Sequence, residues 1–230
     1  MDTLKNKVII YDDVCPLCKA YTGAFVRLGW LKQRTGFACA PAGILDQIDL
    51  DRARHEIPLY DQATGKTLYG LDALFFIIGN RVPLLQPLLR SSVFRAFIKQ
   101  LYQVVTYNRR IIAGSRAPAE GFDCAPDVNR FYRWLYIILA GTAGIWLTTA
   151  HGPAGGVAIM AVHLLWLGAG RSCSRDRLTF TGHWATIFLL AALAGSLLPG
   201  TIPALTGMAG VSLWLWYKRW DLFQLTLSAT

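Results

Sequence analysis

The sequence predicts a chain of two parts, an α/β domain followed by an all-α bundle of four transmembrane helices. Of its 230 residues, 53% are hydrophobic and 16% are charged, whereas ordinary soluble domains contain about 25% charged residues. Residues 1–130 hold 17 basic and 12 acidic residues, and residues 131–230 hold only 6 and 2. The long uncharged stretches of the second half indicate membrane spans. The composition excludes an intrinsically disordered chain and a small disulfide-rich scaffold.

The first eighty residues alternate between strand and helix patterns. The β-branched run Val8–Tyr11 leads into a tight loop, and apolar residues at helical spacing follow it. Further strands are expected at 36–39, 57–61 and 66–70, the last two forming a hairpin, and further helices at 44–54 and 71–79. The order βαβαββα predicts an α/β core over residues 1–82.

A basic amphipathic segment follows this core, at residues 83–113, and residues 114–130 read as a linker with several Pro and Gly. The amphipathic segment has two interpretations. It lies on an anionic membrane surface, or its apolar stripe packs on the α/β domain or on the helical bundle.

Residues 131–230 contain four apolar stretches close to the length that crosses a bilayer, at 133–150, 154–170, 178–199 and 201–217. Basic residues lie before the first stretch, between the second and third, and after the fourth, but not in the other two connections. The positive-inside rule then places both termini and the α/β domain in the cytoplasm. We expect an integral protein of a bacterial inner membrane that contacts anionic lipid. Nucleic acid is not an expected partner, because no recognition motif for it is present.

Cys15 and Cys18 form a Cys-Pro-Leu-Cys motif where the first strand is expected to lead into a helix. Backbone N–H groups at a helix N-terminus lower the pKa of a nearby thiol, so Cys15 is the expected nucleophile. Cys18, one turn later, would resolve the mixed disulfide. Pro16 suits the first turn, where its missing N–H is no loss. Asp12 could accept a proton from Cys18, but its negative charge opposes thiolate formation at Cys15.

The same spacing is also half of a zinc site, for which Cys39 and His55 are the available further ligands, in no paired spacing. Cys39 is otherwise expected to be a small buried residue on its strand. Ile57 and Pro58 favour redox chemistry, because a proline that opens the strand before the hairpin is cis in the thioredoxin fold. There it faces the cysteine pair and its backbone helps to hold a partner chain. The alternative is an ordinary edge-strand or turn proline.

Residues 11–18, Tyr-Asp-Asp-Val-Cys-Pro-Leu-Cys, resemble the Asp-x-x-Cys-x-x-Cys signature of the DCC family of predicted thiol-disulfide oxidoreductases. The similarity extends to residues 69–74 and to the basic stretch at 107–110, and so covers roughly residues 7–113. It implies a thioredoxin-like fold for the α/β domain, with Asp12, Cys15 and Cys18 as the signature positions. Asp13 departs from the glycine expected there and adds an acid near Cys15. The membrane half is not covered.

The sequence therefore predicts a membrane-anchored thiol-disulfide oxidoreductase that acts on a thiol- or disulfide-containing protein or small molecule. The expected catalytic residues are Asp12, Cys15 and Cys18, and the expected substrate contacts are Pro16, Ile57 and Pro58. No metal is expected, and no cofactor besides the Cys15–Cys18 disulfide. The alternative function is a non-enzymatic membrane adaptor or transporter accessory, whose thioredoxin-like domain binds a partner or carries a metal ion.

Four other residues leave roles open. Cys124 and Cys173 are possible partner thiols for Cys15. His163 and His183 fall inside or near predicted spans, where they would bind a quinone, haem or metal, or form hydrogen bonds within the bundle. A quinone-linked disulfide generator that carries its redox pair in the bundle is excluded, because Cys173 is the only cysteine there.

Overall fold

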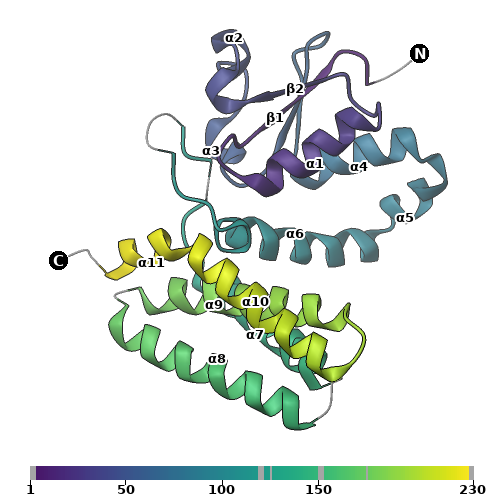
Figure 1. The fold of residues 1–230 in the computed structure, drawn as a ribbon. Helices are drawn as coiled ribbons and strands as arrows, with labels where there is room; N and C mark the ends of the chain where they lie inside the picture. Colours follow the sequence, from purple (N-terminus) through teal and green to yellow (C-terminus); the bar gives the residue numbers. More distant parts are fainter. Residues whose placement is uncertain (1–3, 119–121, 125, 150–152, 175, 228–230) are drawn as a thin grey trace. The chain divides into compact units, whose positions relative to one another are not determined.

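The computed structural model describes residues 4–118, 122–124, 126–149, 153–174 and 176–227. The chain divides into two units, Met1–Val128 and Asn129–Thr230, which we call unit 1 and unit 2. Unit 1 combines a small sheet with helices, and the described part of unit 2 is helical (Figure 1). Each unit is treated by itself below.

Unit 1 is built on a four-stranded sheet with the order β2-β1-β3-β4. Its strands are β1 (Lys7–Tyr11), β2 (Gln33–Gly36), β3 (Pro58–Asp61) and β4 (Thr67–Tyr69). Strand β1 runs parallel to β2 and antiparallel to β3, and β3 pairs with β4 as an antiparallel hairpin. The helices between them are α1 (Pro16–Arg27), α2 (Ala42–Leu45), α3 (Leu50–Ala53) and α4 (Gly70–Arg81). This order of elements is the one predicted from the sequence, and the arrangement does not exclude a thioredoxin-like fold.

Side chains of the sheet alternate between two apolar layers. Ile9 points to the layer made with α1 and α4, where Ala73 and Ile77 are fully buried. Ile10 points to the opposite layer, where it packs with Phe37 and with residues of α3. Because neighbouring strand residues face opposite sides, β1 is buried between the two apolar layers. The loop that leads to Cys15 follows the carboxyl end of this buried strand.

Two local predictions in unit 1 are wrong. Residues 36–39 were expected as a strand, but β2 ends at Gly36 and Phe37–Cys39 form a 3-10 turn, in which Cys39 is exposed. The single helix expected at 44–54 is two short helices, α2 and α3. Asp49 starts the second one, because its side chain accepts a hydrogen bond from the Arg52 backbone N–H.

The basic amphipathic segment forms a 3-10 turn (Pro83–Leu85), α5 (Gln86–Arg90) and α6 (Ser92–Ala113). Ser91 separates the two α-helices and caps α6 by accepting a hydrogen bond from the Phe94 backbone N–H. Helix α6 runs along α1 and α4 (Figure 1), and buries Val104 and Ile111 in unit 1. This packing explains part of the apolar stripe.

Unit 2 consists of α7 (Arg130–Thr149), α8 (Pro153–Cys173), α9 (Arg177–Ser196), α10 (Thr201–Lys218) and α11 (Trp220–Leu227). Helix α9 is central and packs against both α7 and α10. Its Ile187 and Phe188 are buried. Gly144 of α7 allows the close approach, because a Cβ there would lie 2.6 Å from the ring of Phe188.

The prediction of a four-helix transmembrane bundle is wrong. Among the described residues one helix, Arg177–Ser196, is long and apolar enough to cross a membrane, with a mean hydropathy of 1.4. However, 67% of that stretch is buried inside the structure. A mostly buried core helix of a soluble protein meets the same criterion of length and hydropathy. The stretch at 154–170 contributes a shorter apolar helix, Ile159–Arg171. The stretches at 133–150 and 201–217 contain many Gly, Ser, Thr, Trp and Tyr residues, which add length without much hydropathy. The cytoplasmic placement of both termini relied on four spans and stays a prediction.

Candidate active site

Cys15 is placed by the start of α1. It is the residue before the helix, in an extended conformation, and Pro16 is the first helical residue, as the motif predicts. Its carbonyl accepts the backbone N–H of Lys19 at 3.1 Å, so Cys18 sits in the first turn. Both cysteines are free thiols. Both are buried, since Cys15 is 1% exposed and Cys18 is 4% exposed.

The two thiols have very different acidities. A hydrogen bond from Cys18 lowers the pKa of Cys15 from its ordinary value of 9.0 to about 6, even though burial acts in the opposite direction. The hydrogen bond that the Cys18 thiol donates to Cys15 raises the pKa of Cys18 well above its ordinary range, and burial raises it further. At neutral pH Cys15 is therefore a thiolate and Cys18 holds the proton.

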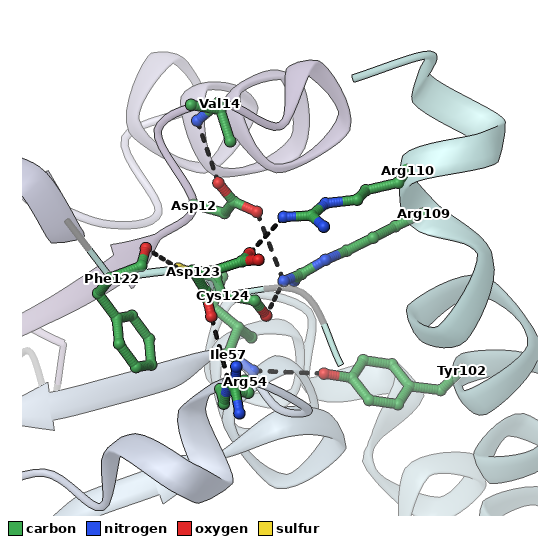
Figure 2. A network of polar contacts seen from close by, with 10 residues as sticks. All are labelled: Asp12, Val14, Arg54, Ile57, Tyr102, Arg109, Arg110, Phe122, Asp123 and Cys124. Carbon is green, nitrogen blue, oxygen red and sulfur yellow. Dashed lines mark hydrogen bonds and ion pairs between the residues drawn. The ribbon is translucent and has the colours of Figure 1, made fainter. Parts of the chain in front are cut away.

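Asp12 and Arg109 form a buried ion pair (Figure 2). Both residues line the same cavity as Cys18. Asp12 is 6% exposed; its Oδ1 accepts the Val14 backbone N–H at 3.0 Å, and its Oδ2 lies 3.4 Å from Arg109 Nη2. Arg109 comes from α6, more than ninety residues later in the chain. Its charge lowers the pKa of Cys15, and the charge of Asp12 raises it, so the pair partly cancels at the thiolate.

Asp13, the residue that departs from the DCC pattern, contacts the turn that follows β2. Its Oδ2 accepts the backbone N–H of Ala38 at 2.7 Å. Gly36 is needed for this contact, because a Cβ at that position would lie 1.5 Å from Asp13 Oδ1. Asp13 thus ties the cysteine loop to the end of β2.

Residues Phe122–Cys124, which we call the Cys124 segment, lie against the same site (Figure 2). Arg109 donates to the Cys124 carbonyl, Arg110 pairs with the Asp123 carboxylate, and Arg54 Nε donates to the Asp123 carbonyl at 3.2 Å. The segment falls in the stretch expected as a linker, yet Cys124 is 3% exposed. Burial raises the pKa of its thiol to about 12, so Cys124 is a protonated thiol at neutral pH.

Ile57 and Pro58 line the same cavity as Cys18, but the peptide bond between them is trans rather than cis. No peptide bond in the described ranges is cis, so the cis-proline expectation for Ile57–Pro58 is wrong. The backbone N–H of Ile57 donates to the Tyr102 hydroxyl at 3.3 Å, and its carbonyl accepts from Gly70. A partner chain would therefore have to displace these bonds to use the backbone of Ile57.

A cavity of about 440 Å³ opens beside Cys18. It brings together Asp12, Cys18, Arg109 and Cys124, and both Ile57 and Pro58 also line it. Most of its wall is aliphatic or aromatic. Pro16 and Cys15 are not part of the wall, so the cavity meets the motif from the side of Cys18.

Cys39 and His55, the candidate further zinc ligands, do not line the cavity beside Cys18. Within the described ranges, no group of three His, Cys, Asp or Glu side chains is placed to hold a metal ion. His55 contacts the ring of Tyr107, with centroids 5.7 Å apart. The side chain of Cys173 lies outside the described residues.

His163 and His183 form hydrogen bonds within unit 2. His163 Nε2 lies 3.1 Å from Ser212 Oγ. His183 Nδ1 lies 3.0 Å from Arg219 Nη1 and accepts a hydrogen bond from it, because a guanidinium has only donors. These bonds correspond to the structural alternative that the sequence left open.

Sequence reasoning did not assign a role to Arg109 or Tyr102, and it considered Cys124 only as a possible partner thiol for Cys15. The basic stretch at residues 107–110 was noted only for its resemblance to the DCC family. The sequence signal for the Asp12–Arg109 pair was that this basic stretch and Asp12 both belong to the resemblance. Comparison of the chain with known protein families, with curated proteins and with solved structures finds no match.

Proposed function

We propose that unit 1 is a thiol-disulfide oxidoreductase whose redox pair is Cys15 and Cys18. The observation that carries this proposal is the position of the two free thiols at the start of α1, with Cys18 donating to Cys15 and lowering its pKa to about 6. A thiolate is the species that attacks disulfides, and a thiol with a pKa near the ambient pH is the most effective attacker. The resemblance of residues 11–18 to the DCC signature supports the same chemistry.

In the proposed reaction the Cys15 thiolate attacks one sulfur of a substrate disulfide. The substrate bond breaks, a mixed disulfide forms on Cys15, and the first substrate thiolate leaves and takes up a proton. Cys18 then loses its proton and attacks Cys15 Sγ, which releases the second substrate thiolate. The pair is oxidised by two electrons and the substrate is reduced by two.

Asp12 is the proposed acceptor of the Cys18 proton. Its carboxylate lines the same cavity as Cys18. Arg109 is a positioning residue, because it holds Asp12 through the ion pair and adds positive charge near both sulfurs. This charge limits the repulsion between the Asp12 carboxylate and the Cys15 thiolate.

The proposal is tested by trapping with the full chain. In a Cys18→Ser variant the resolving step is lost, so a disulfide-containing partner should remain attached to Cys15. The matched control is Cys39→Ser, which removes an exposed cysteine outside the site. Reduction of insulin disulfides should be lost in Cys15→Ser and kept in Cys39→Ser. Equal activity of Cys15→Ser and the unmodified chain would contradict the proposal.

A further inference from the structure

The cavity beside Cys18 has an almost wholly apolar wall. Helices α1, α4 and α6 and strand β3 contribute side chains that include Leu17, Tyr21, Pro58, Leu74, Ile98 and Val105. Its volume of about 440 Å³ falls in the range of pockets that enclose small molecules. A cavity of this kind favours a compact apolar ligand over an extended hydrophilic peptide.

The polar groups of the cavity gather at the end next to the cysteines, and they already bind one another. Asp12 pairs with Arg109, and Arg109 also donates to the Cys124 carbonyl. Tyr102 accepts the backbone N–H of Ile57. A charged or strongly hydrated substrate would lose water in this cavity and find few partners to replace it.

We propose that unit 1 reduces an apolar disulfide of low molecular weight, whose alkyl chain occupies this cavity while its sulfurs meet the cysteine pair. The inference rests on the proposed function and specifies its substrate class. Cys15 forms a bond to one substrate sulfur and expels the first alkanethiolate, which takes up a proton. Cys18 gives up its proton, attacks Cys15 Sγ and expels the second alkanethiolate. An external dithiol then reduces the Cys15–Cys18 disulfide and completes the cycle.

The test measures kcat/KM of the full chain for symmetrical dialkyl disulfides from dimethyl to dibutyl, with dithiothreitol as the reductant. Hydroxyethyl disulfide is the neutral hydrophilic control. Each rate is divided by that of the uncatalysed reaction with dithiothreitol, which removes differences in intrinsic reactivity. Because burial of a methylene favours binding about fourfold, kcat/KM should rise about fourfold for each added methylene of the buried chain.

The outcomes separate this inference from the proposed function. If all the disulfides are reduced with no dependence on chain length, the cavity does not select the substrate and the inference is overturned while the oxidoreductase proposal stands. The same holds if apolar cysteine peptides are reduced efficiently and the alkyl series is flat. If the chain reduces none of the disulfides, both proposals fail.

A pair of variants tests whether the cavity is responsible. Val105 lines the cavity one turn before Arg109, and Val105→Trp should fill it and remove most of the dependence on chain length. Leu84→Trp is the matched control, because Leu84 is 87% exposed and lies outside the cavity wall. Retention of the full dependence in Val105→Trp would contradict the inference. If circular dichroism shows that Val105→Trp is unfolded, Leu101→Trp takes its place, because Leu101 of α6 also lines the cavity. The alkyl series of the unmodified chain decides independently.

Discussion

The acidity of Cys15 provides the most detailed prediction, because its largest cause is one neighbouring side chain. The pKa of Cys15 is lowered from 9.0 to about 6, and the hydrogen bond from Cys18 is the largest contribution. This change corresponds to ~4 kcal/mol in favour of the thiolate. Since Cys15 is 1% exposed, solvent screens this interaction little.

The perturbation is Cys18→Ala, which removes the donor. A hydrogen bond to a charged group contributes about 1.5–3 kcal/mol, or ~1–2 pH units. The pKa of Cys15 should therefore rise from about 6 to roughly 7–8. At pH 7 the thiolate fraction should fall from about 0.9 to between about 0.5 and about 0.1.

The assay is the pH dependence of thiolate ultraviolet absorbance in the reduced chain. The spectrum of the same protein with Cys15→Ser is subtracted, so that only Cys15 is followed. Cys39→Ala serves as the control, because Cys39 is exposed and outside the site. The reasoning is refuted if Cys15 titrates near 9 in the unmodified chain, or if Cys18→Ala leaves its pKa unchanged.

Two further predictions concern how the site is held. Arg109→Gln breaks the buried pair with the Asp12 carboxylate and should destabilise unit 1 by about 3–5 kcal/mol, whereas Arg110→Gln removes a partly exposed pair and should cost under about 1 kcal/mol. Urea unfolding of the full chain, with hydrogen exchange of unit 1 amides, measures both effects. Equal effects would contradict the role of Arg109 as the buried partner that holds Asp12. Gly36→Ala forces the cysteine loop to shift and should cost about 1–3 kcal/mol, but Gly43→Ala meets open space and should be neutral or slightly stabilising. A neutral Gly36→Ala would show that the loop is not fixed by its contact with β2.

The strand, loop and helix around the cysteines could be predicted because their signals are local. The β-branched run before the motif and the proline after Cys15 determine β1 and the start of α1, and both lie where the sequence placed them. The hairpin and the helix after it also follow from short-range turn and periodicity signals. Local patterns of this kind carry most of the element order of unit 1.

The rest of the site depends on contacts that are distant in the chain. Arg109 reaches Asp12 only because α6 runs along α1, and the Cys124 segment returns to a site formed more than a hundred residues earlier. The prediction of four transmembrane helices was wrong for another reason, because it relied on length and low charge. An uncharged helix of sufficient length can be covered by other helices, and α9 is mostly buried by α7 and α10. Absence of charge alone does not distinguish these two environments.

The central claim, that Cys15 and Cys18 are a redox pair, is tested most directly by equilibrating the full chain with mixtures of reduced and oxidised glutathione. Acid quenching followed by mass spectrometry of the cysteine peptides then gives the fraction of each disulfide. The account predicts one reversible two-electron transition that forms the Cys15–Cys18 disulfide, and its loss in Cys15→Ser. Two thiols that remain reduced in oxidised glutathione, or glutathione adducts that never convert to an internal disulfide, would contradict it.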